Sequence, residues 1–253
     1  MDIEEGFQQT TPLGFMNTET LSEICVWRGR LLMTYSYFDT FDEKLKNIIE
    51  IGSKHYDEAC ILIFVYLDFL SNFVEKPYSS NNARFNGSNF RYFLQHYSHF
   101  QDTLKYIQVD RFINDFSKGR ISKDEYQKYY DKIEEELEKV KNGVELPISS
   151  FFSLDNIDLE HKEYFQKITL FNLIYSLRNS AVHGYNNLIE AGSELSEPYL
   201  SYTWNIEEGN EGWFTTYIPF DFMYRMVDNC YLKVREEYGS LVERFFEEDT
   251  DIT

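Results

Sequence analysis

The chain contains few of the residues that interrupt regular structure. Its 253 residues include 12 glycines and 5 prolines. Because these two residues mark most turns between short elements, their scarcity argues against a fold of many short strands and favours long helices. Cysteine is also scarce: Cys25, Cys60 and Cys230 are odd in number and far apart, so the sequence predicts neither a disulfide framework nor a zinc site. Cys60 and Cys230 lie in apolar stretches, where we expect buried free thiols.

Positive charge and long apolar runs are in short supply as well. The 24 lysines and arginines against 43 acidic residues give a net charge of −19, which repels nucleic acids and anionic membranes at long range. A non-specific electrostatic DNA binder is therefore not expected, whereas an enzyme acting on nucleic acid is compatible if its few cations converge on one cleft. The most apolar run, 59–70, contains Asp68 and is too short to cross a bilayer. The acidic N-terminus does not resemble a signal peptide, and we expect a cytoplasmic protein.

Hydrophobic and aromatic residues, in contrast, are plentiful. Hydrophobic residues make up 43% of the chain and aromatic residues 18%, which is enough for a full core and too much for a disordered chain. Their helical spacing predicts a mainly α fold with a small β-hairpin before the C-terminal helix. We expect an N-terminal arm over 1–40, one helical domain over 41–246 with a helical insert at about 101–157, and an acidic tail over 247–253.

Local patterns predict the order of the elements. A capping box of Ser122 and Glu125 begins a charged helix, and Asp158 is in position to cap the helix that follows it. Gly52 interrupts the first helix. Alternating apolar residues on either side of a Gly-containing turn mark a hairpin. The sequence thus predicts helices over 42–74, 89–100, 122–141, 159–182 and 222–246, and strands over 199–206 and 213–218.

The segment Arg178-Asn179-Ser180-Ala181-Val182-His183-Gly184 ends the fourth of these helices. Arginine is a permanent cation whose planar fork fits phosphate, and histidine is the side chain best suited to proton transfer near neutral pH. Five positions along a helix turn about 500°, so Arg178 and His183 point about 140° apart. Both would reach one target if Gly184 loosens the last turn, or if a second copy of the helix contributes across a two-fold axis.

Several other residues bear on this motif. Arg91 and His96 have the same spacing, but the bulky aromatic residue after Arg91 and their position inside a helix favour packing over chemistry. Asp68, in the most apolar helix, either lies near the cleft or has a structural role, as a cap or in an ion pair. Asn179 either orients His183, contacts the phosphate or caps the helix end. In the simplest alternative, the motif is a surface arginine and a histidine with no chemical task.

In its order of elements the chain resembles the HEPN superfamily, in particular its bacterial abortive-infection-like members. The resemblance covers roughly 45–246. It rests on the Arg-x4-His motif with a polar residue after the arginine, on the apolar helix followed by Arg91-Tyr92-Phe93, and on the hairpin and last helix. It implies a HEPN-like helical bundle that forms a homodimer with the active site at the interface. It further implies a toxin or antiphage-defence effector with an inhibitory or activating protein partner. The acidic surface and the charged helical projection over 121–142 are candidate docking places for that partner.

The activity implied by the resemblance is metal-independent cleavage of RNA. His183 would be the general acid and base, Arg178 would hold the scissile phosphate and stabilise developing charge, and Asn179 would support them. Attack by the 2′-OH would leave a 2′,3′-cyclic phosphate and a 5′-OH. No cofactor is expected, and the absence of HExxH and CxxC predicts no metal site. The alternative hypothesis is a non-catalytic HEPN-like helical module that binds a protein or nucleotide partner.

Overall fold

The chain folds mainly into α-helices, which confirms the predicted fold class. The computed structural model describes residues 38, 40–52, 54–72, 74, 86–142, 146–183, 201–205 and 212–250. Within them lie a helix over 40–52, α2 (Tyr56–Ser71), α3 (Asn86–Tyr97), α4 (Val109–Ser117), α5 (Lys123–Lys141), α6 (Lys162–Gln166), α7 (Leu170–His183), α8 (Phe220–Thr250), β1 (Leu146–Pro147), β2 (Ser201–Asn205) and β3 (Trp213–Tyr217). Apart from 38 and 40, the predicted N-terminal arm lies outside the described residues, as does Gly184.

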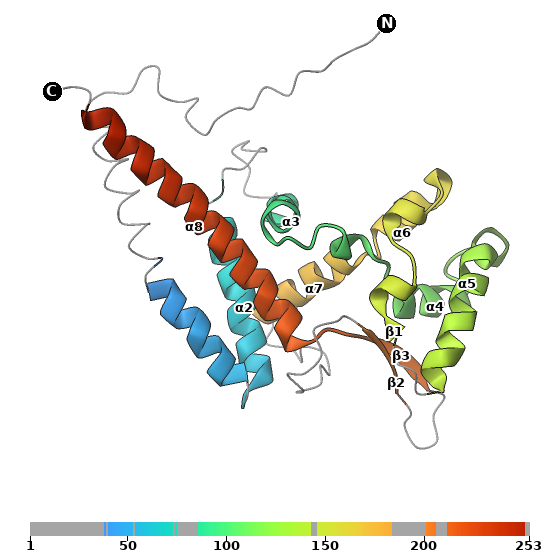
Figure 1. Cartoon of the computed structure of the whole chain (residues 1–253). Helices are drawn as coiled ribbons and strands as arrows, with labels where there is room; N and C mark the ends of the chain where they lie inside the picture. Colours follow the sequence, from blue (N-terminus) through green and yellow to red (C-terminus); the bar gives the residue numbers. More distant parts are fainter. Residues whose placement is uncertain are drawn as a thin grey trace, which may run out of the picture.

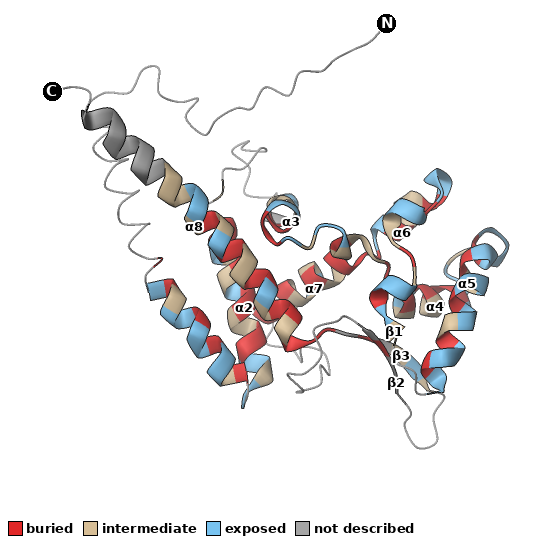
Figure 2. Cartoon of the chain, viewed as in Figure 1, coloured by how far each residue is buried: buried red, intermediate tan, exposed pale blue. Residues whose placement is uncertain are grey.

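Helix α2 is at the centre of one half of the molecule. It packs against α8 and against α7 (Figure 1). The sequence predicted this central position because α2 is apolar on nearly all sides. Both helices carry many buried residues (Figure 2). On α2 these include Ala59, Ile63, Leu67 and Leu70, and on α8 they include Met226, Val227 and Val234. Full burial of an aliphatic side chain contributes about 1.5–3 kcal/mol, so this contact is the main apolar support of the region.

Polar contacts attach the long helix α8 to its neighbours. Arg235 donates from Nη1 to the Asp42 carboxylate at 2.7 Å, which links α8 to the helix over 40–52. The Tyr97 hydroxyl donates to Glu237 at 2.6 Å and links α8 to α3. The helix continues to Thr250, past the predicted end at 246, so part of the predicted tail is helical.

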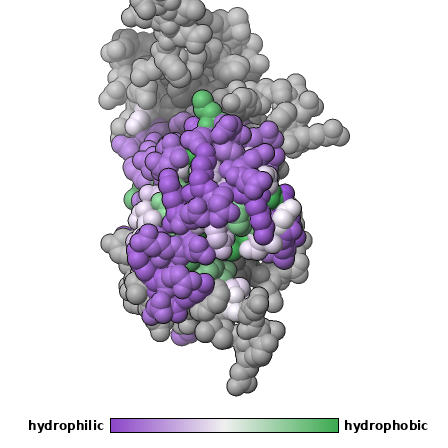
Figure 3. All heavy atoms as spheres, turned by 90° about the vertical axis from the view of Figure 1, so that its right-hand side faces the viewer, coloured by the Kyte–Doolittle hydropathy of each residue, from purple (hydrophilic) through white to green (hydrophobic). Residues whose placement is uncertain are grey.

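The other half of the molecule is formed by α4, α5, α6 and a small sheet. Strands β2 and β3 form the predicted antiparallel hairpin, and β1, which the sequence did not predict, pairs with β2. The buried Tyr202 of β2 donates its hydroxyl to the Ile107 carbonyl at 2.7 Å and accepts from the Val109 amide at 3.1 Å. These bonds attach the hairpin to the start of α4. The end of the molecule formed by α5 and α6 is largely hydrophilic (Figure 3).

The predicted helix over 159–182 is wrong in one respect, because the chain interrupts it before α7. It forms a 3-10 turn at Leu159–His161, then α6, and then α7. Two backbone bonds hold the segment between α6 and α7. The backbone N–H of Gln108 donates to the Ile168 carbonyl at 2.8 Å, and the backbone N–H of Leu170 donates to the Tyr106 carbonyl at 2.7 Å. These bonds to a distant segment replace helical ones, which explains the interruption.

Both predicted helix caps can be compared with the structure. The Ser122 hydroxyl accepts from the Glu125 amide at 3.4 Å, so the start of α5 is as predicted. Asp158 does precede the 3-10 turn, but its carboxylate makes no cap. It accepts instead from Lys128 and from the Tyr129 hydroxyl.

Gly52 provides a test of the packing at the start of α8. A Cβ atom on this buried glycine would lie 2.5 Å from Cζ of Phe220, whose own position is fixed in the core. We expect Gly52→Ala to lower the free energy of unfolding by about 1–3 kcal/mol, because the ring has to move. Urea unfolding followed by circular dichroism measures the change. The control is Lys46→Ala on the exposed side of the same helix, which should stay within about 0.5 kcal/mol; equal effects would contradict the packing.

Candidate functional site

The predicted motif lies at the end of α7. The helix runs through Arg178 and ends, within the described residues, at His183. The motif therefore occupies the last turn and a half of this helix, as the sequence predicted. The side chain of His183 is outside the described residues, and the described part of the site consists of Arg178 and its surroundings.

Arg178 is buried where three helices meet. The residue is 5% exposed, and its Nη2 donates to the carboxylate of Asp68 on α2. Its Nη1 donates to Oδ1 of Asn179, the next residue on α7, at 2.8 Å. On α3, the ring of Phe90 lies with its centroid 5.7 Å from the guanidinium carbon. The ion pair with Asp68 was one of the two alternatives predicted for that residue.

The guanidinium of Arg178 keeps an unused donor. Its Nε is buried and has no hydrogen-bond partner among the described residues. A buried N–H without a partner costs free energy. The Nε–H of Arg178 can therefore donate to a further acceptor, and such a bond would remove this cost. The Asp68 side chain is 34% exposed, so the ion pair is reached by solvent from the carboxylate side.

Asn179 contacts the arginine of the motif. Its amide oxygen accepts from Arg178, and the residue is half-buried. Since Asn179 and Asp68 hold different nitrogens of the same planar group, they fix the orientation of the guanidinium between them. The role that this geometry gives Asn179 is to position Arg178.

The second copy of the spacing, Arg91 and His96, has the surroundings of a packing contact. The Arg91 guanidinium lies 4.1 Å from the centroid of the Phe171 ring, and its Nη2 donates to Asn172 at 3.1 Å. Arg91 thereby holds α3 against α7. His96 is exposed and stacked on Tyr92, with ring centroids 4.0 Å apart. The preference for the copy at the end of α7 agrees with this arrangement.

One group of metal-ligating residues occurs among the described residues. Asp158, Glu160 and His161 bring their ligand atoms within 4.8 Å of one another. The ammonium of Lys128 already binds the Asp158 carboxylate and lies 4.0 Å from Glu160. Because this ammonium takes the position that a metal cation would need, the cluster is better described as an ion-pair network.

The two cysteines of the described region are buried free thiols, as predicted. Burial raises the pKa of Cys60 to about 11 and that of Cys230 well above its ordinary value. Since the thiolate is the reactive form, neither is suited to nucleophilic chemistry or metal binding at neutral pH.

Comparison of the chain with protein-family models, with curated proteins and with solved structures found no match. The HEPN resemblance therefore stays a prediction. None of the helices in the described part of the chain is both long and apolar enough to span a membrane.

The ion pair between Asp68 and Arg178 can be tested by neutralising the carboxylate. We expect Asp68→Asn to lower the free energy of unfolding by about 1–3 kcal/mol, because it leaves a buried guanidinium with a weaker acceptor. Glu163→Gln makes the same chemical change in the exposed pair with Lys167 and should leave the free energy of unfolding nearly unchanged. Both values come from urea unfolding at neutral pH. Similar effects of the two substitutions would show that the buried pair contributes no more to stability than the exposed one.

Proposed function

We propose that the chain is a metal-independent endoribonuclease of HEPN type, with Arg178 and His183 as its catalytic residues and Asn179 in support. The observation that supports this best is a preorganised arginine: the Arg178 guanidinium is held in a fixed orientation by Asp68 and Asn179. His183 follows it on the same helix. Preorganised positive charge is the most effective means of stabilising charge that develops in a transition state.

The chemistry needs only these two kinds of group. RNA carries its own nucleophile, the 2′-OH, so the enzyme has to move protons and stabilise the phosphorane. His183 moves the protons, and its position near the C-terminus of α7 favours its protonated form. Arg178 binds the phosphate, and the products carry a 2′,3′-cyclic phosphate and a 5′-OH.

In this proposal the phosphate competes with Asp68 for the arginine. Carboxylate and phosphate are the two anions that the guanidinium fork binds in the same geometry. The phosphate therefore either displaces Asp68 or uses the Nε–H that has no partner among the described residues. The partial exposure of Asp68 gives the side from which the ion pair is approached.

Two further parts of the proposal come from the family resemblance alone. A homodimer would bring two copies of Arg178 and His183 together, which would concentrate positive charge on an acidic chain. The biological role would be that of a bacterial toxin or antiphage-defence effector in the cytoplasm, restrained or activated by a protein partner.

One observation favours a second candidate, the non-catalytic helical module. Arg178 is 5% exposed and paired within its own chain. A purely structural arginine that holds α2 against α7 has the same arrangement. The two candidates differ in whether the motif is needed for RNA cleavage.

Cleavage of a mixed RNA pool that includes tRNA, in excess EDTA, separates the two candidates. We expect wild type to cut RNA and not DNA, and His183→Ala to lose about 10²–10⁴-fold in rate, the usual contribution of a general acid or base. Arg178→Lys keeps the charge but loses the planar fork, and it should also be slower. His96→Ala is the matched control because His96 has the same spacing to Arg91 and is exposed.

The endoribonuclease and the non-catalytic module predict different results in this assay. End-group analysis should find the cyclic phosphate in the wild-type products. Cutting by His183→Ala at the wild-type rate would contradict the proposed site. Absence of cutting by the wild type, together with equal tolerance of wild type and His183→Ala on expression in bacteria, would favour the non-catalytic module.

A further inference from the structure

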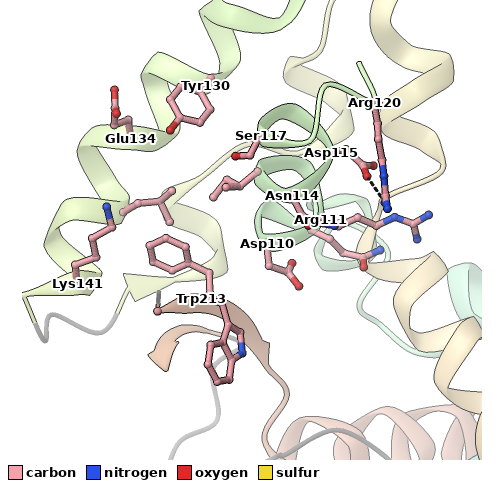
Figure 4. Close-up of a pocket in the computed structure, with 15 residues that line it drawn as sticks. Asp110, Arg111, Asn114, Asp115, Ser117, Arg120, Tyr130, Glu134, Lys141 and Trp213 are labelled. Atoms are coloured by element: carbon pink, nitrogen blue, oxygen red, sulfur yellow. Dashed lines mark hydrogen bonds and ion pairs between the residues drawn. The ribbon is translucent and has the colours of Figure 1, made fainter. Parts of the chain in front are cut away.

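A cavity of about 780 Å³ lies in the half of the molecule away from the α2–α7–α8 core. It opens between α4, α5 and β3 (Figure 4). Cavities of about 300–1,000 Å³ are the size that small organic ligands occupy. The described residues of the motif on α7, Arg178 and Asn179 among them, do not line it, so a ligand here is separate from the Arg178 side of the proposed cleavage site.

Two arginines lie at one end of the cavity. The guanidinium groups of Arg111 and Arg120 lie at the same end, beside Asp115 (Figure 4). Asp115 accepts from Arg120 at 3.0 Å and also from the Tyr164 hydroxyl at 3.1 Å. Arg111 is exposed and has no hydrogen-bond or ion-pair partner within the described part of the chain. Two guanidinium groups at the same end of a cavity are suited to binding a phosphate.

Aromatic side chains line the same cavity. Trp213, at the start of β3, is 42% exposed, and Tyr130 and Phe214 also line the cavity. A large indole left in contact with water is uncommon in a packed chain, because its burial is worth more than that of most side chains. Exposed aromatic rings beside arginines are the usual means of binding unpaired bases, since every base has a face on which to stack.

Hydrogen-bonding groups lie between the charged end and the tryptophan. Asp110 and Asn114 are one turn apart on α4 and both line the cavity (Figure 4). Asp110 is held in place because its Oδ1 accepts from the Thr216 hydroxyl at 2.9 Å. The Asn114 amide has no side-chain partner among the described residues. Burial raises the pKa of Asp110, while its hydrogen bond with Thr216 and the charge of Arg111 act in the opposite direction.

We propose that this cavity binds a nucleotide, with its base stacked on Trp213 and its phosphate at Arg111 and Arg120. Asp110 and Asn114 are then placed to bond the edge of the base. The same chemistry can come from a free mononucleotide or from an unpaired nucleotide of an RNA strand. The proposal does not rest on the proposed cleavage activity, because none of these residues belongs to the motif on α7.

Isothermal titration of the full-length protein tests the proposal. The probes are the four ribonucleoside 5′-monophosphates and an unstructured 2′-O-methyl oligonucleotide, which lacks the free 2′-OH needed for cleavage. We expect saturable binding that Arg111→Ala and Trp213→Ala each weaken at least about ten-fold. Arg225→Ala is the matched control, since it removes an exposed arginine of α8 that pairs with Asp221 outside the cavity. This control should bind like the wild type.

The outcomes identify the source of the ligand and can overturn the proposal. Binding of a monophosphate indicates a free nucleotide, and binding of the oligonucleotide alone indicates an RNA strand. No saturable binding of either probe, or binding that both substitutions leave unchanged, overturns it. Because the exposed side chain of Arg111 makes no hydrogen bond or ion pair within the described residues, Arg111→Ala should stay close to the wild-type melting temperature. His183→Ala should bind normally, which separates failure of this proposal from failure of the proposed cleavage.

Discussion

A charged arginine among apolar helices constrains how α2, α3 and α7 can be arranged. Removing a guanidinium from water is costly unless a carboxylate and further acceptors face it. In this fold α2 supplies the carboxylate of Asp68, α7 supplies the amide of Asn179, and α3 supplies the ring of Phe90. Moving α2 or α7 by one residue rotates its side chains by about 100° and separates the pair. We infer that the ion pair specifies the alignment of the two helices more than it adds net stability, which is a common balance for buried ion pairs.

The burial and pairing of Arg178 also determine how the proposed active site would bind its substrate. An arginine that is only structural needs its partners permanently, whereas an arginine that binds substrate has to exchange one anion for another. Arg178 has features of both situations: its Nη atoms are occupied, and its Nε has no acceptor within the described residues. Asp68 lies at the edge of the ion pair and is partly exposed, so it is the partner that an incoming phosphate would meet first. Binding of substrate and alignment of α2 would then depend on the same carboxylate.

The parts of the fold that were predictable are those determined by near neighbours in the chain. Apolar spacing identified α2 and α8, a hydroxyl three residues before a glutamate identified the start of α5, and alternation identified the hairpin. The interruption before α7 was missed because it depends on bonds to Tyr106 and Gln108, about 60 residues earlier. Asp68 and Arg178 were each singled out, but periodicity shows which face a residue occupies and not which residue it meets. The cavity lined by Trp213 and Arg111 could not be predicted for the same reason, since three separate segments form it.

The net charge of −19 opposes the approach of both proposed ligands at long range, because each carries phosphate. The long-range field, however, is screened beyond about 8 Å at physiological ionic strength. Within that distance the local arrangement of a few cations decides. The chain uses arginine in two opposite ways: Arg178 is buried and already paired, while Arg111 is exposed and has no partner in the described region. A buried arginine offers a fixed geometry but has to release an anion, and an exposed one offers easy access but little orientation. Chemistry at a phosphate needs the first property and capture of a nucleotide needs the second, so an acidic chain can accommodate both without a basic surface.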